Sequence, residues 1–281
     1  PAQGELVECS FNPSVNALLS QSNIGSWLHW VEVLTGEQPA ELGGFPYSIR
    51  TRKTRFLFDG SPDGRGYDYV LLQVKNWFPD QAIIEQTYDY VGLDAKNIIV
   101  TIPGSTKPDE YVLMVAHLDD TSWNSIGGRI APGANDNAIG AATLLEAARL
   151  FRQMRFERSI RLIWFTGEEA GTVGSRAYVR DYGNLDYRGV INLDMFGWDG
   201  DGDRCFEIHV GTILGSDEIG SCMAETITSY THDLKYDYLK TNATGRSDHI
   251  NFWLKDIGAI AVSENFSDAG SENGCLDADM N

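Results

Sequence analysis

The sequence predicts an α/β protein in which a mainly parallel β-sheet lies between two layers of helices, a three-layer α/β/α sandwich. Two observations support this prediction. From about residue 95 onward, short apolar segments of strand length alternate with amphipathic segments of helix length, which is typical of parallel strands covered on both faces. The 281 residues contain no internal repeat and no low-complexity tract, so we expect a single domain over residues 1–281.

Residues 1–95 are expected to form an N-terminal lead-in that packs on this domain. Apolar residues recur at helical spacing in 22–36, and Gly36 is a suitable end for that helix. The segment 66–78 has the pattern of a second amphipathic helix, and 82–91 that of a strand.

The alternating elements follow in residues 96–281. Short apolar segments predict strands at 96–104, 111–117, 159–166, 189–197 and 257–265. Longer amphipathic segments predict helices at 137–154, 171–183 and 216–234. The first of these helices places alanine and leucine on its inner face, as a helix packed against a sheet does.

The net charge of the chain indicates which classes of partner it can bind. The formal net charge is −18, which argues against nucleic acid and anionic membranes and suits cationic ligands and bound metal ions. A solvated acidic surface is the simpler explanation for most of this charge. No stretch approaches the roughly 20 apolar residues of a membrane span. We therefore expect neither nucleic acid nor a membrane as a partner.

The four cysteines, Cys9, Cys205, Cys222 and Cys275, form no CxxC pair, which excludes zinc-knuckle and thioredoxin-like sites. An even number fits two disulfides in a secreted protein, with three possible pairings. Four buried free thiols are the alternative. The chain begins "PAQGELVEC" without an initiator methionine, so we expect a processed or trimmed start and an extracellular location.

Side chains that bind metals in other proteins follow the buried strands or begin the helix at 137–154. They are His117, Asp119, Asp136, Glu168, Glu169 and Asp194. Because ligands collect beyond the carboxyl ends of parallel strands, we expect these side chains to share one edge of the sheet. Adjacent carboxylates at the end of a buried strand repel each other and are costly to desolvate. Glu168 and Glu169 therefore predict a bound cation.

Each residue alone also has a purely structural interpretation. Asp136 is well placed to cap a helix, Asp194 could cap a turn, and His117 could be a hydrogen-bonded core histidine. Together they favour a metal, because a cluster of unpaired carboxylates is too costly for a structural role. Imidazole with carboxylates and no thiolate suits zinc, or manganese or cobalt, in a catalytic site. A carboxylate shared by two ions about 3.5–4 Å apart would make a two-metal site.

Four motifs resemble a known family. In chain order they are "AHLDD", "APGANDNAIGAATLLEAARLF", "FTGEEAGTVGSRAYV" and "NLDMFGW". They resemble the M28 family of zinc aminopeptidases, in particular its bacterial leucyl-aminopeptidase-like members, and the resemblance extends from about residue 20 to the end. It implies the zinc exopeptidase fold with a mainly parallel mixed sheet, and hydrolysis of the N-terminal peptide bond of peptides.

The resemblance also implies a set of metal ligands. His117 and Asp194 would bind one zinc ion, Glu169 would bind the other, and Asp136 would bridge the two. A complete site would hold two zinc ions, and a half-built site one.

Two residues would serve the chemistry itself. By the same resemblance Glu168 would be the general base that takes a proton from water, and Asp119 would orient His117. One glutamate of the adjacent pair would thus move a proton while Glu169 holds metal.

The chain departs from the family in one respect. The family's last zinc ligand is a histidine in an "HTT"-like segment beyond the final apolar strand, whereas this chain ends at "SENGCLDADMN". We expect a nick, with the missing segment bound as a C-terminal fragment, or a truncation that impairs the site. The alternative is that His249 of "GRSDHINFW" replaces the missing ligand. The remaining histidines are expected to be surface or core residues: His29, His209 and His232.

Three acidic residues resemble the start of a calcium loop. Asp199, Asp201 and Asp203 alternate in "WDGDGDRC", but the twelfth position, where a bidentate glutamate is expected, is Val210. A solvated acidic turn is the favoured interpretation, and Ca²⁺ the alternative.

Two other functions remain open. A glutaminyl cyclase of the same fold would use a single zinc ion and cyclise N-terminal glutamine without water, but the resemblance to the cyclases is weaker at "AHLDD" and "GANDN". A binding protein would keep the fold and lose the metals. The chain retains all the early ligands, which favours an enzyme.

Overall fold

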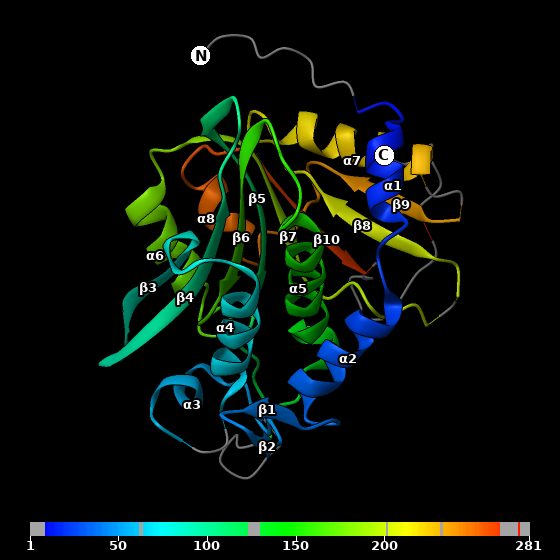
Figure 1. Ribbon diagram of the computed structural model, residues 1–281. Coiled ribbons are helices and arrows are strands. Elements are labelled where there is room, and N and C mark those ends of the chain that lie inside the picture. The colour runs from blue at the N-terminus through cyan, green and yellow to red at the C-terminus, as the bar shows by residue number, and fades with distance from the viewer. Residues whose placement is uncertain are drawn as a thin grey trace.

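A twisted, mixed β-sheet runs through the middle of the computed structural model (Figure 1). The structure describes residues 9–61, 64–122, 130–200, 202–230, 233–264 and 275. Among these residues the sheet has eight strands in the order β3-β4-β6-β5-β7-β10-β8-β9. Their bounds are β3 Ile83–Tyr90, β4 Leu93–Ile102, β5 Lys107–His117, β6 Arg158–Phe165, β7 Asp186–Leu193, β8 Cys205–His209, β9 Lys235–Leu239 and β10 Ala259–Glu264.

The four central strands, β6, β5, β7 and β10, run parallel to one another. β4 and β8 pair with this group in the antiparallel direction, which makes the sheet mixed. The central strands are apolar on both faces, and every residue of β10 is buried. This pattern is expected for parallel strands that are covered by helices on both faces. The predicted α/β class with a mainly parallel mixed sheet is confirmed.

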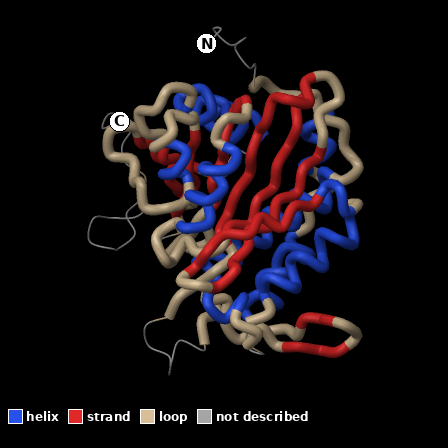
Figure 2. Tube along the Cα trace, turned by 90° about the vertical axis from the view of Figure 1, so that its left-hand side faces the viewer, coloured by secondary structure: helices blue, strands red, loops and turns tan. Residues whose placement is uncertain are grey.

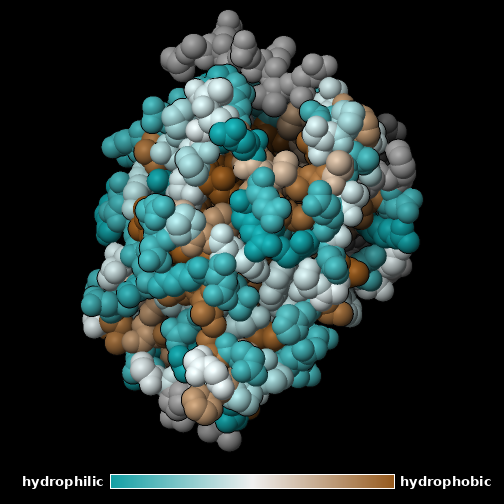
Figure 3. All heavy atoms as spheres, in the orientation of Figure 1, coloured by the Kyte–Doolittle hydropathy of each residue, from teal (hydrophilic) through white to brown (hydrophobic). Residues whose placement is uncertain are grey.

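Helices cover both faces of the sheet (Figure 2). α2 (Ile24–Thr35), α4 (Gly66–Trp77) and α5 (Ile139–Phe151) share a hydrophobic core on one face, which includes Leu144 of α5 and Trp164 of β6. α6 (Val173–Tyr182) and α8 (His249–Trp253) pack on the other face, and α7 (Ser216–Tyr230) contacts β7 and β10. Hydrophilic residues predominate on the outside of the face that carries α4 and α5 (Figure 3).

The predicted lead-in is built into this architecture. β3 belongs to the main sheet, and side chains of α2 and α4 lie in the same core as those of α5. That the whole chain is one domain stays a prediction.

Several short elements were not foreseen from the sequence. They are α1 (Pro13–Leu19), the hairpin of β1 (Ala40–Leu42) and β2 (Phe45–Tyr47), α3 (Thr54–Phe58), β8, β9 and α8. Each has three to seven residues, too few for a hydrophobic period to show in the sequence. The helix predicted at 137–154 begins at Ile139, and a wider turn, η3 (Ala134–Ala138), precedes it.

All four cysteines form disulfides. Cys9 pairs with Cys222 and links the chain before α1 to α7, while Cys205 of β8 pairs with Cys275. The expectation of two disulfides is confirmed, and the alternative of four free thiols is wrong. As for the membrane, no helix in the described part of the chain has both the length and the apolar composition of a span.

We predict that Leu144→Ala destabilises the fold by about 2–5 kcal/mol, because it opens a cavity between α5 and the sheet. Leu144 is fully buried in the core, whereas Leu254 is 76% exposed and provides a matched control. Leu254→Ala should change the free energy of unfolding by no more than about 0.5 kcal/mol. Urea denaturation of the two variants measures the difference, and equal effects would contradict this packing.

Candidate metal centre

The carboxyl ends of the central strands bring the predicted site residues to one edge of the sheet. β5 ends at His117, which lies opposite Phe165, the last residue of β6. Glu168 and Glu169 follow β6 directly, and Asp194 is the first residue after β7. The parallel register of the three strands therefore determines that these side chains are neighbours.

His117 lies at the centre of the cluster. Its Nε2 is 3.1 Å from Oδ1 of Asp194 and 3.2 Å from Oδ1 of Asp136. The three residues offer ligand atoms that all lie within 4.8 Å of one another, the spacing expected around one ion. His117 is almost completely buried, and the two carboxylates are partly exposed. The structure thus brings together three of the four predicted ligands.

Asp136 reaches the cluster because the chain makes a wide turn before α5. Its backbone is extended (φ −113°, ψ 94°), and the residue that precedes α5 is Ala138. Asp136 is therefore not the cap of that helix. The next residue, Asn137, is buried and donates a hydrogen bond from Nδ2 to the carbonyl of Leu193 at 2.8 Å. This bond ties the turn to the end of β7, beside Asp194.

Asp119 holds the neighbouring groups in two different ways. Its backbone carbonyl lies 3.0 Å from Nδ1 of His117, whereas its carboxylate Oδ1 lies 3.8 Å from that nitrogen. The carboxylate instead accepts the backbone N–H groups of Glu168 at 3.1 Å and of Glu169 at 3.3 Å. Asp119 thus contacts His117 through its main chain and fixes the glutamate pair through its side chain.

Thr54, at the start of α3, completes the environment of Asp119. Its Oγ1 donates a hydrogen bond to Oδ2 of Asp119 at 2.7 Å, and both side chains are buried. The sequence contains no signal for this contact, because Thr54 lies 65 residues before Asp119 and only the tertiary fold brings them together.

The protonation of the cluster reflects its crowding with acids. Burial raises the pKa of Glu168 to about 9, and the nearby carboxylates of Asp248 and Asp194 add to this effect. Burial and the carboxylate of Asp136 raise the pKa of Glu169 to about 7. Burial opposes protonation of His117, but the charges of Asp194 and Asp136 outweigh it and raise its pKa well above the usual value.

These residues fit a divalent metal. Oε1 of Glu169 is buried and has no hydrogen-bond partner, as expected of an oxygen that is oriented to bind an ion. One imidazole with several carboxylates and no thiolate is a donor set of catalytic zinc sites. A cation would offset the repulsion that otherwise keeps protons on these acids.

Asp248 is a neighbour that the sequence interpretation missed. It is fully buried, and burial together with the charges of Asp119 and Asp194 raises its pKa to about 7. In the sequence, its segment "GRSDHINFW" pointed only to His249 as a possible ligand. An aspartate before a histidine was the available signal.

His249 lies outside the cluster. Its Nε2 is 2.8 Å from the carbonyl of Thr244, and its ring packs edge-on against Trp253 with the ring centroids 4.5 Å apart. Burial lowers the pKa of His249 to about 4, so the ring is neutral at physiological pH. Nε2 thus has a carbonyl partner, whereas Nδ1 is buried without a hydrogen-bond partner, and His249 as the replacement ligand stays a prediction.

The remaining histidines have structural contacts where the structure describes them. Nε2 of buried His209 lies 2.8 Å from Glu207 and 3.0 Å from Ser263, and exposed His29 contacts Gln38. His232 lies outside the described residues.

The calcium prediction is untested. Asp201 lies outside the described residues, and the carboxylate of Asp203 accepts the backbone N–H groups of Cys205 and Cys275. Ca²⁺ at Asp199, Asp201 and Asp203 stays a prediction.

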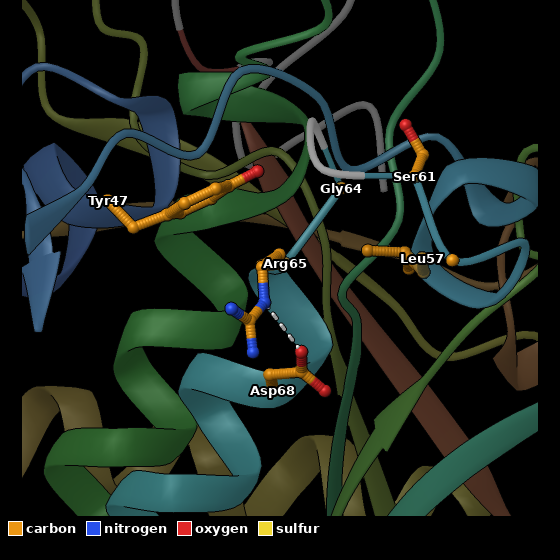
Figure 4. Close-up of a pocket in the computed structure, with 7 residues that line it drawn as sticks. Tyr47, Leu57, Ser61, Gly64, Arg65 and Asp68 are labelled. Atoms are coloured by element: carbon orange, nitrogen blue, oxygen red, sulfur yellow. Dashed lines mark hydrogen bonds and ion pairs between the residues drawn. The ribbon is translucent and has the colours of Figure 1, made fainter. Parts of the chain in front are cut away.

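A separate cavity of about 280 Å³ lies between α3 and the start of α4 (Figure 4). Arg65 and Asp68 form an ion pair in its wall, and Tyr47 and Leu57 line it further. None of the acidic residues of the cluster contributes to this cavity.

Comparison with known proteins agrees with this geometry. Residues 97–273 match the family model described as peptidase family M28. This chain belongs to peptidase family M28. The family that the four motifs suggested is thereby confirmed.

Individual proteins resemble this chain at lower levels of identity. Aminopeptidase YwaD of Bacillus subtilis is 30% identical over 164 residues, which are 56% of this chain and 33% of the relative. The chain thus matches about a third of the length of this curated relative. LapA of Legionella pneumophila superimposes with a TM-score of 0.75 at 21% identity, over 96% of this chain and 69% of LapA. Bacteroides thetaiotaomicron glutaminyl cyclase does so with a TM-score of 0.61 at 20% identity, over 89% and 87% of the two chains.

We predict that zinc binding to the metal-free protein at about pH 7.5 releases at least about one proton per chain. Below their raised pKa values, His117 and Glu168 hold protons, and a metal requires a neutral imidazole and ionised carboxylates. Calorimetric titration in buffers of different ionisation enthalpy measures the number released. Glu168→Gln should release fewer protons. A count near zero for the wild type would show that the cluster does not hold protons in place of metal.

Proposed function

We propose that this chain is a zinc-dependent aminopeptidase that hydrolyses the N-terminal peptide bond of peptides. The observation that carries the proposal is the convergence of His117, Asp136 and Asp194 beside Glu169, whose buried oxygen has no partner. Membership of family M28 and the aminopeptidase name of the B. subtilis relative support the same conclusion.

The ligands would be divided between two ions. His117 and Asp194 would hold one, Glu169 would hold the other, and Asp136 would bridge them. Bound zinc supplies a water molecule of lowered pKa and polarises the scissile carbonyl.

Glu168 is the group that moves the proton in this proposal. It accepts a proton from the attacking water and returns it to the leaving amine nitrogen. Its backbone N–H donates to Asp119 at 3.1 Å, which fixes the main chain of Glu168 beside the ligands. Without metal the pKa of Glu168 is raised to about 9, and bound cations would lower it toward the pH at which the enzyme works.

The acidic surroundings also suit the substrate. A free peptide N-terminus carries a positive charge, and the net charge of −18 together with the carboxylates of the cluster attracts it. We do not assign the preferred N-terminal residue.

The last histidine of the family's ligand set has no counterpart among the described residues of the cluster. We propose that a C-terminal fragment of the same precursor supplies it. Mass spectrometry of the purified native protein detects such a fragment, and a second ion bound without it would rule the fragment out.

We further propose that the protein is secreted. Two disulfides are typical of oxidising compartments, and one of them closes a loop of 213 residues between Cys9 and Cys222. Recovery of the native protein from the extracellular fraction, with both disulfides formed, tests this proposal.

A glutaminyl cyclase is the second candidate, because one of the similar structures is the glutaminyl cyclase of Bacteroides thetaiotaomicron. The two reactions are separated by incubating the enzyme with a peptide that begins with glutamine. Release of free glutamine indicates hydrolysis, and loss of ammonia with an intact chain indicates cyclisation.

We predict that Glu168→Gln retains its metal while kcat falls by about 10²–10⁴-fold, because the amide cannot accept the proton. Hydrolysis of leucine p-nitroanilide and elemental mass spectrometry of the same sample provide the two values. Glu157→Gln, a change at an exposed glutamate with its own lysine partner, is the control and should leave kcat unchanged. Full activity of Glu168→Gln would remove this residue from its proposed role.

We predict that Asp136→Ala loses both ions together, because one carboxylate serves both. Asp186→Ala, at the opposite end of β7, should bind as much metal as the wild type. Metal content per chain is measured on protein that has not been exposed to a chelator. Loss of a single ion would show that Asp136 does not bridge.

A further inference from the structure

One arginine is completely buried next to the candidate metal centre. Arg52 lies between the β1–β2 hairpin and α3, and its side chain has no exposed surface. Its guanidinium donates to four backbone carbonyls: those of Leu34, Leu118, Pro132 and Gly133. The bond to Leu118 is 2.8 Å long, that to Leu34 is 3.0 Å and that to Gly133 is 2.8 Å.

These carbonyls belong to three separate segments that meet at the cluster. Leu34 lies in the last turn of α2, and Leu118 directly follows the ligand His117. Pro132 and Gly133 immediately precede η3, the wide turn that carries Asp136. One planar side chain therefore connects the end of β5 to the segment that delivers the proposed bridging ligand.

The backbone of the same segment strengthens this connection. The N–H of Ala131 donates to the carbonyl of Arg50 at 3.0 Å, and the N–H of Asp120 donates to the carbonyl of Arg52 at 3.3 Å. Gly133 then turns sharply with a φ of +40°, and a Cβ there would lie only 2.0 Å from the carbonyl oxygen of Asp136. The chain therefore makes a tight turn into η3 at the point where Arg52 binds it.

Burying the charge of Arg52 costs free energy, and good packing would not require a charged side chain here. Among the described residues Arg52 forms no ion pair, and all its hydrogen bonds go to neutral carbonyls. A buried charge without a direct partner is expensive, and a well-packed apolar side chain would usually be cheaper. The acidic groups that favour its charge most are Asp120, Asp136 and Asp119, of which Asp136 is a proposed metal ligand.

We propose that Arg52 is the positioning residue for Asp136. Its guanidinium holds Pro132 and Gly133 against the end of β5, so that Asp136 meets His117 before any metal binds. This inference rests on the proposed function, because it takes the cluster as the metal site. Arginine is suited to the task, since its planar donors reach several carbonyls at fixed angles, which a lysine ammonium cannot do.

The experiment compares Arg52→Lys and Arg52→Met with Arg161→Lys. Arg161 is the matched control, because it is also buried but binds Thr101 of β4 and Tyr178 of α6, away from the cluster. Zinc dissociation constants are measured by competition with a chelating dye, at a temperature where circular dichroism shows each variant folded. Both Arg52 variants should bind zinc at least about tenfold more weakly, since Lys retains the charge but not the fork. Arg161→Lys should remain within about threefold of the wild type.

Wild-type zinc affinity in Arg52→Lys would overturn the proposal. Wild-type zinc binding and peptide hydrolysis, measured alongside, decide the proposed function, so the two failures are distinguishable.

Hydrogen exchange of the wild-type protein tests the same inference if the Arg52 variants do not fold. If Arg52 holds the segment, the amide hydrogens of Ala131 and Ala138, which donate to Arg50 and Gly133, exchange slowly with and without zinc. Fast exchange of both in the metal-free protein, followed by protection on adding zinc, would show that the metal and not Arg52 holds the turn. That result would overturn the proposal.

Discussion

Repulsion among buried carboxylates at one edge of the sheet is the constraint on which the rest of the structure depends. The parallel register of β5, β6 and β7 places a histidine and several acids at neighbouring strand ends. Burial and nearby like charges raise the pKa of Glu168, Glu169 and Asp248, and so disfavour ionisation of these three acids in the metal-free protein. The free-energy cost of these buried acids must be offset by hydrogen-bond donors and positive charges nearby, and the surrounding elements provide them.

The N-terminal region provides much of that compensation. Thr54 at the start of α3 donates to Asp119, and Arg52 places a fixed positive charge beside Asp120 and Asp136. These contacts give residues before β3 a role in the chemistry of strand ends that are far away in sequence. The segment therefore packs on the sheet and also provides a hydrogen-bond donor and a positive charge next to the acids of the cluster.

The sequence was sufficient to predict the central sheet and the meeting of His117, Asp136 and Asp194 at one edge of it, because each signal is local. A buried apolar segment followed by a carboxylate or histidine is visible within about ten residues. Arg52 and Thr54 gave no comparable signal, since their contacts depend on segments that meet only in the folded chain. Asp136 was predicted in part: the sequence placed it near the other site residues, but it did not predict the wide turn in which its backbone is extended. The short strands β8 and β9 were missed because five residues are too few to show a period.

Asp119 contacts the ligand, the proposed base and the N-terminal segment at the same time. Its carbonyl contacts the imidazole of His117, its carboxylate holds the backbone of Glu168 and Glu169, and Thr54 donates to that same carboxylate. Because Asp119 is fully buried, removing any of these donors leaves a charged oxygen without water to replace it. The ligand, the base and the N-terminal segment are therefore coupled through one group. A change in any one of them alters the position of the other two.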